Sequence, residues 1–262
     1  MEVKPQKSDM GEIETTNKNI YNTSMNQPTY TATQVAALDH YTTEVLGVDI
    51  LQLMEAAGMR SAESALKLFG KGKDIAVLSG PGGNGGDALV CAKWLKLCGC
   101  NPTIYLSHPE EKLKPVTKRQ LDIWRAFDDT SACGGLSTID NRLSKAQRVE
   151  SRLSNGVYDR PSGPVDGIID GLLGYSLEGD PRGKSAELIE WANESGAPIL
   201  ALDIPSGLDA TTGEVFTPCI KANHTVVFGV MKVGLTKDGA SDYTGEIELV
   251  DIGFPKSIVE KS

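Results

Sequence analysis

A glycine-rich segment, Gly80-Pro-Gly-Gly-Asn-Gly-Gly-Asp87, constrains the fold more than any other feature of the sequence. The apolar residues 75–78 before it are typical of a buried strand, and residues 88–97 after it carry apolar side chains at helical spacing. We therefore expect a turn that joins a strand to a helix. Glycines let the backbone approach a ligand closely, and the N–H groups at the start of a helix favour a phosphate. The simpler interpretation is a tight turn that needs its glycines only for its shape.

Apolar segments of strand length alternate with helical segments along the rest of the chain. This alternation favours an α/β protein with a mostly parallel central sheet and helices on both faces. Two further helices precede the sheet, one after the capping-box residues Thr31 and Gln34 and one near Asp49. The expected strands are residues 75–79, 102–106, 165–169, 198–202, 225–228 and 246–250, and the expected helices between them are residues 88–97, 116–127 and 184–193.

The chain of 262 residues is expected to form one domain over residues 29–262, after a disordered tail over residues 1–28. The tail is polar and shows no hydrophobic periodicity. Residues 128–163 are rich in Gly, Ser, Asn and charges of both signs. This composition predicts a surface insertion, with one short helix around residues 143–153.

The composition excludes several classes of partner. A net charge of −9, from 26 basic and 35 acidic residues, argues against a protein that binds a nucleic-acid backbone. No apolar run approaches the length of a membrane span, so we expect no membrane partner. The five cysteines have no metal-ligand or disulfide-framework spacing, which is typical of a reducing compartment. The first residues form no apolar signal region, and their acidic side chains argue against a typical mitochondrial leader. The predicted location is therefore cytoplasmic, with a mitochondrial pool as the open alternative.

Two more predicted strands are followed by an Asp. Asp170 follows one of them and a glycine-rich loop comes next, whereas Asp203 follows another and precedes a Pro-Ser-Gly turn. Ligands of open parallel sheets bind at the carboxyl ends of the strands, where the strand order reverses. Either Asp could instead simply cap the loop that follows it. Because carboxylate, hydroxyl and amide oxygens suit a hard cation, Asn84, Asp170 and Ser206 are candidate ligands.

These motifs resemble the YjeF N-terminal domain family. The resemblance rests on the glycine-rich segment, on Asp170 with Gly174-Tyr-Ser-Leu-Glu-Gly-Asp180, and on Asp203-Ile-Pro-Ser-Gly207, and it covers roughly residues 30 to 255. It implies a Rossmann-like three-layer α/β/α sandwich that forms a homodimer. The implied activity is the interconversion of the R and S epimers of NADHX and NADPHX, which are hydrated, damaged forms of the reduced cofactors. Coupling to a separate dehydratase, which repairs only the S epimer, is implied as well.

The resemblance also implies which residues form the site. Asn84, Asp170 and Ser206 would hold a potassium ion, and Lys232 matches a lysine that follows the family's next strand. Gly83 and Ala88 depart from the family, which usually has Asn and Gly there, so a side-chain amide is lost at Gly83. The residues that would line the damaged nucleotide are Gly83, Asn84, Gly85, Gly86, Asp87, Gly174, Tyr175, Ser176, Leu177, Glu178, Gly179, Asp180 and Asp203.

Inversion of the substrate carbon requires a proton donor and a proton acceptor. This carbon bears a hydroxyl next to a ring nitrogen. It can invert by loss of hydroxide to an iminium and readdition on the other face, or by ring opening. One carboxylate can serve both steps in turn, and Asp203 is the candidate, with Lys232 as the second catalytic residue.

Two other functions are open at this point. Gly80-Pro-Gly-Gly-Asn-Gly85 also satisfies the dinucleotide fingerprint G-x-G-x-x-G, but the acidic residue expected after the next strand is absent from Tyr105-Leu-Ser-His108. Hydride transfer with undamaged NAD would support an oxidoreductase. Ligand binding without epimerisation would support a non-catalytic nucleotide-binding or protein-interaction module.

Overall fold

The computed structural model describes residues 28–130, 161, 163–255 and 259. The predicted tail, residues 1–28, therefore lies outside the described residues except for its last position. Most of the predicted insertion, residues 128–163, and its expected helix around residues 143–153 also lie outside them.

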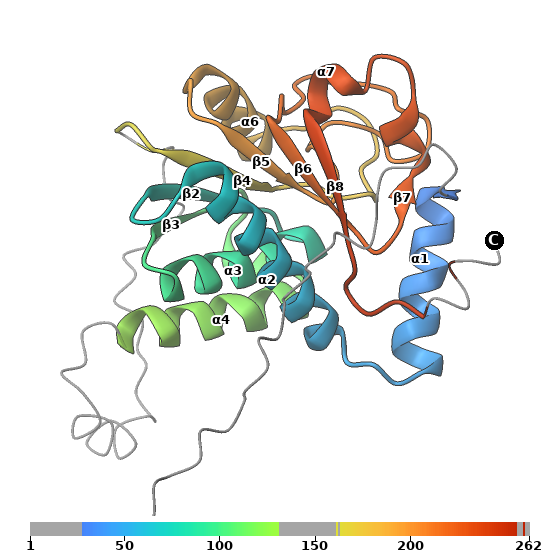
Figure 1. Ribbon diagram of the computed structural model, residues 1–262, viewed down its shortest axis with the longest axis horizontal. Helices are drawn as coiled ribbons and strands as arrows, with labels where there is room; N and C mark the ends of the chain where they lie inside the picture. The colour runs from blue at the N-terminus through green and yellow to red at the C-terminus, as the bar shows by residue number, and fades with distance from the viewer. Residues whose placement is uncertain (1–27, 131–160, 162, 256–258, 260–262) are drawn as a thin grey trace, which may run out of the picture.

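Six parallel strands form the central sheet, in the order β3-β2-β4-β5-β6-β8 (Figure 1). Helices lie on both faces of this sheet, so the predicted three-layer α/β/α arrangement is confirmed. The strands are β2 (Asp74–Ser79), β3 (Asn101–Leu106), β4 (Gly167–Gly171), β5 (Ile199–Leu202), β6 (His224–Phe228) and β8 (Glu246–Val250). One face carries α2 (Ile50–Phe69), α3 (Gly83–Leu97) and α4 (Pro115–Thr130), and the other carries α6 (Lys184–Glu194) and α7 (Ser241–Thr244).

The strand order reverses next to β2. The chain passes from β2 outward to β3 at one edge of the sheet and then returns to β4 on the other side of β2. Such a reversal leaves a crevice at the carboxyl ends of the two central strands, which is where open α/β sheets bind ligands. The glycine-rich segment follows β2, and the loop with Gly174 follows β4. Both predicted loops therefore lie at this crevice.

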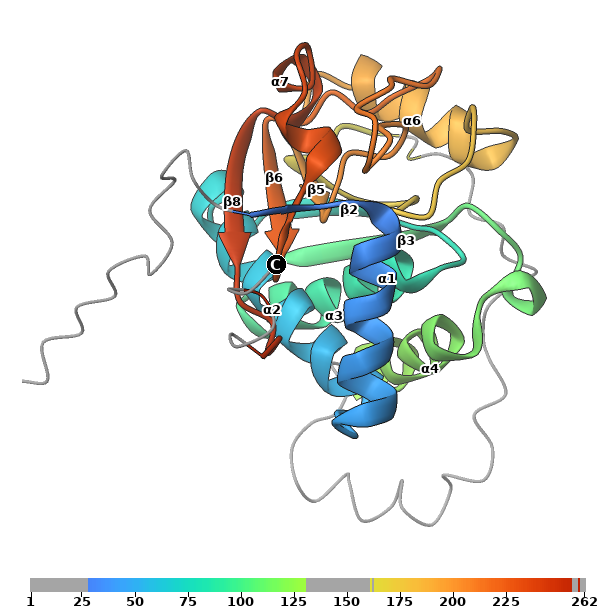
Figure 2. The same cartoon turned by 90° about the vertical axis from the view of Figure 1, so that its right-hand side faces the viewer.

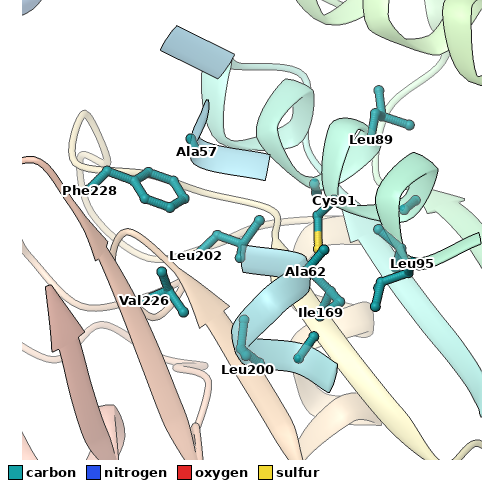
Figure 3. Packing of buried hydrophobic residues seen from close by; sticks show 14 of the residues in the cluster. Ala57, Ala62, Leu89, Cys91, Leu95, Ile169, Leu200, Leu202, Val226 and Phe228 are labelled. Atoms are coloured by element: carbon teal, nitrogen blue, oxygen red, sulfur yellow. The ribbon is translucent and has the colours of Figure 1, made fainter. Parts of the chain in front are cut away.

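The largest hydrophobic cluster lies between the sheet and helices α2 and α3 (Figure 3). The two helices approach each other closely because α2 contains Gly58, where an added Cβ would lie 2.5 Å from the Cβ of Val90. Removal of these apolar surfaces from water is the main contribution that holds the layers together. Buried members of the cluster are Ala57, Ala62, Leu89, Cys91, Leu95, Ile169, Leu200, Leu202, Val226 and Phe228.

Helix α1 (Ala32–His40) stands apart from the two helical layers (Figures 1 and 2). Its predicted capping box between Thr31 and Gln34 is confirmed, and the helix continues as the π-helix η1 (Tyr41–Val45). Strand β1 (Thr29–Tyr30) precedes it and pairs with β7 (Met231–Lys232). The α1 region is therefore tied to the loop after β6. The 3-10 helices are η2 (Glu110–Lys112) and η3 (Val233–Thr236).

Two predicted boundaries are wrong, and both affect the site. The helix expected at residues 88–97 already begins at Gly83, so most of the glycine-rich segment is helical. Tertiary packing overrides the low helix propensity of glycine here, because a Cβ at Gly85 would lie 2.0 Å from the backbone oxygen of Gly80. The strand expected at residues 165–169 is β4, residues 167–171, so Asp170 lies inside the strand. No helix within the described ranges is both long and apolar enough to cross a bilayer.

Glu248 connects β8 to α2 at the sheet edge. Its carboxylate accepts hydrogen bonds from Ser64 Oγ (2.5 Å) and Lys67 Nζ (3.0 Å), and His224 Nε2 lies 3.3 Å from it. The contact with His224, followed by those with Ser64 and Lys67, lowers the pKa of Glu248 from 4.5 to about 2, although burial opposes the shift.

We expect Glu248→Gln to lower the melting temperature at neutral pH. Because the pKa of Glu248 is depressed in the folded protein, its stabilisation is present above about pH 4.5 and is lost as the pH falls towards 2. The difference in melting temperature between parent and variant, followed by circular dichroism, should shrink over that range. Glu214→Gln, at an exposed position, is the control. A difference that stays constant with pH would contradict this account.

Candidate functional site

The glycine-rich segment and the loops after β4 and β5 contact one another directly. Asn84 Nδ2 donates a hydrogen bond to the backbone oxygen of Leu173 (3.0 Å), and a Cβ added at Gly174 would lie 3.4 Å from the Cβ of Asn84. The amide of Leu173 in turn donates to Ser206 Oγ (2.9 Å). The structure therefore brings together the three loops that the sequence singles out.

Asp170 and Ser206 form a buried hydrogen-bonded pair. The amide of Ser206 donates to Asp170 Oδ2 (2.8 Å), and Ser206 Oγ donates to Asp170 Oδ1 (2.6 Å). Burial raises the pKa of Asp170 to about 6, although the hydrogen bonds from Ser206 and Leu172 favour its ionised form. Beside the same loop, Asn84 Oδ1 is buried and has no hydrogen-bond partner within the described residues.

A buried carboxylate, a serine hydroxyl and an unpartnered amide oxygen suit a hard monovalent cation. A buried acceptor without a partner costs about 1–3 kcal/mol, and coordination of a cation removes that cost. Within the ranges that the structure describes, no three His, Cys, Asp or Glu side chains are grouped to hold a metal ion. The donor set therefore has one carboxylate and otherwise neutral oxygens, which does not favour a transition metal. The predicted ligands Asn84, Asp170 and Ser206 fit a cation such as potassium.

Helix α3 begins just after β2, where the strand order reverses, with Gly82 as its N-cap. The N–H groups of residues 83–85 are not used by the helix and carry its partial positive charge, so they suit an anion. A Cβ added at Gly83 would meet only Met54 Cε, at 3.9 Å, whereas one at Gly86 would lie 2.9 Å from the same atom. Position 83 is therefore open, and position 86 is closed by packing.

The glycines of this segment do not provide unusual backbone angles. None of them, from Gly80 to Gly86, has a positive φ. At the expected turn the chain is already in α3, where Gly85 and Gly86 lie against Gly80 and Met54 and leave little room for a Cβ. The start of α3 at Gly83 is open, so we expect a ligand to approach the backbone there.

Asp203 follows β5 directly and has a φ of 65°, the one positive value among non-glycine residues that the structure describes. Asp is among the few residue types that tolerate this region, and such an angle often marks a functional position. Asp203 Oδ1 accepts hydrogen bonds from the amide of Phe228 (3.0 Å) and from Lys232 Nζ. Lys232 Nζ also donates to the backbone oxygen of Phe228 (2.9 Å).

Both charges of this pair are withdrawn from water. Asp203 is 6% exposed and Lys232 is 1% exposed. Taking two charges out of water is expensive, and only close hydrogen-bonded pairing compensates for it. The two predicted catalytic residues are therefore in contact, and each holds the other in place.

Two more carboxylates and a phenol lie near this pair. Burial raises the pKa of Asp87 well above its ordinary value, and the charges of Asp203 and Asp39 raise it further. Burial also raises the pKa of Asp39, and the charge of Asp203 adds to this rise. Tyr175 OH donates a hydrogen bond to Asp39 Oδ2 (2.8 Å). The positive charge of Lys232 opposes both of these pKa shifts.

Asp39 is a residue near the Asp203–Lys232 pair that the sequence analysis did not single out. It belongs to no motif and lies 131 positions before Asp170 and 164 positions before Asp203. One signal was available, because Asp39 lies beside the buried stripe of α1, which includes Val35 and Leu38. A carboxylate next to an apolar stripe of a helix is buried on one side and needs a partner.

Residues 174–180, after β4, form the loop that the sequence predicts to line the nucleotide, called the nucleotide loop below. Its end is less closely tied to the Asp203–Lys232 pair. The amide of Leu177 donates back to the oxygen of Gly174 (3.2 Å) and closes a turn. Asp180 Oδ1 accepts from the amide of Thr217 (2.9 Å), so this carboxylate connects two loops. Exposed members of the loop are Ser176, Glu178 and Asp180.

A large cavity lies elsewhere, beside α6. Its volume is about 1010 Å³, and its lining includes Val165, Glu187 and Trp191. None of the predicted site residues lines it. The chemistry at the strand ends, rather than the size of this cavity, identifies the candidate site.

The part of the chain that matches known proteins includes the candidate site. The sequence model of the family described as "YjeF-related protein N-terminus" matches residues 50–234. An NAD(P)H-hydrate epimerase of Elusimicrobium minutum is 33% identical over 237 residues, which are 89% of this chain and 99% of the relative. A bifunctional NAD(P)H-hydrate repair enzyme Nnr of Hyperthermus butylicus is 38% identical over 226 residues, which are 86% of this chain but 38% of the relative. The chain spans about two fifths of the length of such bifunctional relatives.

One solved structure supports the fold. The crystal structure of yeast ynu0 matches with a TM-score of 0.62 and 24% identity, covering 86% of this chain and 88% of its own. At this identity the likeness concerns the three-layer architecture.

Proposed function

Because the chain belongs to the family of YjeF-related N-terminal domains, we propose that it is an NAD(P)H-hydrate epimerase, an isomerase that interconverts the R and S epimers of NADHX and NADPHX. The observation that carries this proposal is the buried Asp203–Lys232 pair at the strand ends, beside a helix start suited to phosphate. A relative named as this epimerase matches the chain over 99% of its own length. The dehydratase step belongs to a separate activity, to which this one is functionally coupled.

The proposed chemistry assigns the proton transfers to Asp203. A proton from the Lys232 ammonium passes to the Asp203 carboxylate, to which it is hydrogen-bonded, and from there to the hydroxyl on the carbon next to the ring nitrogen. The C–O bond breaks with its electron pair, releasing water. The nitrogen lone pair forms an iminium. Water then adds to the opposite face and returns a proton to the Asp203 carboxylate. Lys232 fixes the carboxyl group, and positioned acid–base catalysis of this kind contributes roughly 10²–10⁴-fold.

We also propose that Asn84, Asp170 and Ser206 hold a potassium ion. The support is the unpartnered, buried Asn84 Oδ1 beside the Asp170–Ser206 pair. A bound potassium ion would supply a fixed positive charge at the point where the three loops meet.

Asn84→Ala is expected to remove most of the rise in melting temperature that potassium gives the parent. An ion that binds only the folded state stabilises it by about 2.7 kcal/mol at 100 times its Kd. The measurement compares melting temperatures in potassium chloride and in choline chloride at equal ionic strength. Asp170→Ala should behave in the same way, and Asn101→Ala, at an exposed position, should keep the parent's response. An unchanged potassium response in Asn84→Ala would refute the assignment.

The activity is tested by supplying (R)-NADHX together with a dehydratase that accepts only the S epimer. With the chain present, the R epimer should be consumed and NADH should appear, at a rate proportional to the amount of chain. Tight binding of NADHX without this conversion would instead support the non-catalytic module. Reduction of undamaged NAD by a hydride donor would support the oxidoreductase.

The predicted homodimer and cytoplasmic location stay predictions, and sedimentation of the purified chain tests the first.

A further inference from the structure

A hydrogen bond connects two segments that are far apart in the sequence and close to the proposed catalytic pair. Tyr175, in the loop after β4, donates its hydroxyl proton to Asp39 Oδ2 at 2.8 Å, across 136 sequence positions. Asp39 is the penultimate residue of α1. This contact therefore joins the nucleotide loop to a helix that carries no other predicted site residue.

The side chain of Tyr175 is held by apolar contacts. It is partly buried and packs against two hydrophobic clusters, one between the sheet and α2 and α3, and one that includes Ile204 and Leu208. Burial raises the pKa of the Tyr175 hydroxyl, and the nearby charges of Asp39, Asp203 and Asp87 raise it further. The phenol therefore stays protonated and acts as a donor beside these carboxylates.

Helix α1 gives Asp39 a fixed position. The segment before the helix pairs with β7, with Tyr30 opposite Lys232, and the amide of Ala32 donates to Thr211 Oγ1 (2.9 Å). The helix is thus anchored at its start to the loop that carries Lys232, and Asp39 extends from its last turn. Residues 174–180 form a loop without regular structure, so an anchor on a helix limits where Tyr175 can lie.

We propose that Asp39 is a positioning residue, whose carboxylate holds the Tyr175 hydroxyl and so fixes the Tyr175 ring as a wall of the nucleotide site beside Asp203. The inference rests on the proposed function and adds to it a residue outside all three strand-end loops. Asp39 acts through Tyr175, so its contribution is to substrate binding in ground and transition states alike.

Asp39→Ala is expected to raise KM for NADPHX about tenfold while kcat stays within about twofold of the parent. Loss of an interaction made equally in both states has this signature. Asn at position 39 keeps an oxygen that accepts the Tyr175 hydrogen bond, so Asp39→Asn should restore KM to within about threefold. Tyr175→Phe should resemble Asp39→Ala, and the double variant should be no worse than either, because both changes remove the same contact.

His40→Ala is the control for general disturbance at the end of α1, since His40 is exposed and adjacent. It should keep the parent's KM. If KM for NADPHX rises as much in Asp39→Asn as in Asp39→Ala, the charge of Asp39 matters rather than its hydrogen bond, and the proposal is wrong. Additive effects in the double variant would contradict it too. Tyr175→Phe tests the contact even if Asp39→Ala does not fold.

Calorimetry with NADPHX separates this inference from the proposed function. If the parent binds NADPHX but does not epimerise it, the proposed function fails while the inference is still tested. Asp39→Ala should then bind about tenfold more weakly than the parent, and Asp39→Asn nearly as tightly. Equal affinity of parent and Asp39→Ala would overturn the inference whether or not the parent is active.

Discussion

Asp203→Asn is expected to lower the rate of epimerisation by at least about 100-fold, because an amide cannot give or accept the required proton. Asn also tolerates the positive φ that Asp203 adopts, and its amide oxygen can still accept from Phe228 and Lys232. The backbone at position 203 should therefore keep its conformation. Steady-state rates with (R)-NADHX and the S-specific dehydratase give the comparison.

The structure corrects one expectation about this variant. From the sequence, Asp203→Asn should change folding little, but Lys232 is 1% exposed and would lose its counter-charge. Breaking a buried ion pair costs about 3–5 kcal/mol, and each kcal/mol lowers the melting temperature of a protein of this size by about 2–4 °C. We therefore expect a clear loss of stability together with the loss of activity.

A second variant separates these two effects. In Asp203→Asn combined with Lys232→Met, both buried charges are gone, so the melting temperature should recover most of its loss. The activity should remain at the level of Asp203→Asn. Asp209→Asn, in the same loop, should match the parent, because Asn can accept the same backbone hydrogen bonds from Thr211 and Thr212. Activity of the double variant within a few-fold of the parent would exclude Asp203 from the mechanism.

The second large effect is expected from charge at position 83. Gly83 is open, so Asp and Asn can both be placed there without a clash. If the substrate phosphate sits on the first turn of α3, Gly83→Asp repels it by about 2–3 kcal/mol per charge at roughly 6 Å and an effective dielectric constant of about 20. We expect KM to be about 10–100 times higher for Gly83→Asp than for Gly83→Asn.

Of the two variants at position 83, the one expected to bind the substrate more weakly, Gly83→Asp, is not expected to be the less stable. An acidic side chain in the first turn of a helix is favourable by about 0.3–1 kcal/mol, so Gly83→Asp should melt no lower than Gly83→Asn. Asn at this position also restores the amide that the family usually has, and we expect it to lower KM below that of the parent. Gly83 is a more informative position than Gly86, because a larger side chain at Gly86 would meet Met54. Equal KM values for the two variants would place the phosphate elsewhere.

The layers and most strands could be predicted because apolar periodicity is a local signal. The capping box at Thr31 was equally readable, since it is contained in four residues. The helix start expected near Asp49 has a capping box as well, which the structure shows. The start of α3 was not readable, because glycine disfavours helix and only its packing against Gly80 and Met54 makes helix the better state there. Those contacts come from elsewhere in the chain, and no local pattern shows them.

The candidate site also contains some residues that a local sequence pattern indicates and others that it does not. Asp170, Asp203 and the glycine-rich segment were recognisable because each ends or follows an apolar run of strand length. Lys232 came only from the resemblance, and its contact with Asp203 came from the structure. Asp39 was missed because its importance depends on Tyr175, 136 positions away, and a single sequence holds no record of that pairing.

The pairing of β1 with β7 also determines when the site can form during synthesis. About 200 residues separate Tyr30 from its partner Lys232, and a ribosome adds about 5–20 residues per second, so α1 waits roughly 10–40 s for the strand that anchors it. During that time Val35 and Leu38 have no native partner from the loop after β6. A nascent chain can thus build the β2–β3 pair early, yet it completes the candidate site only after Lys232 has been synthesised.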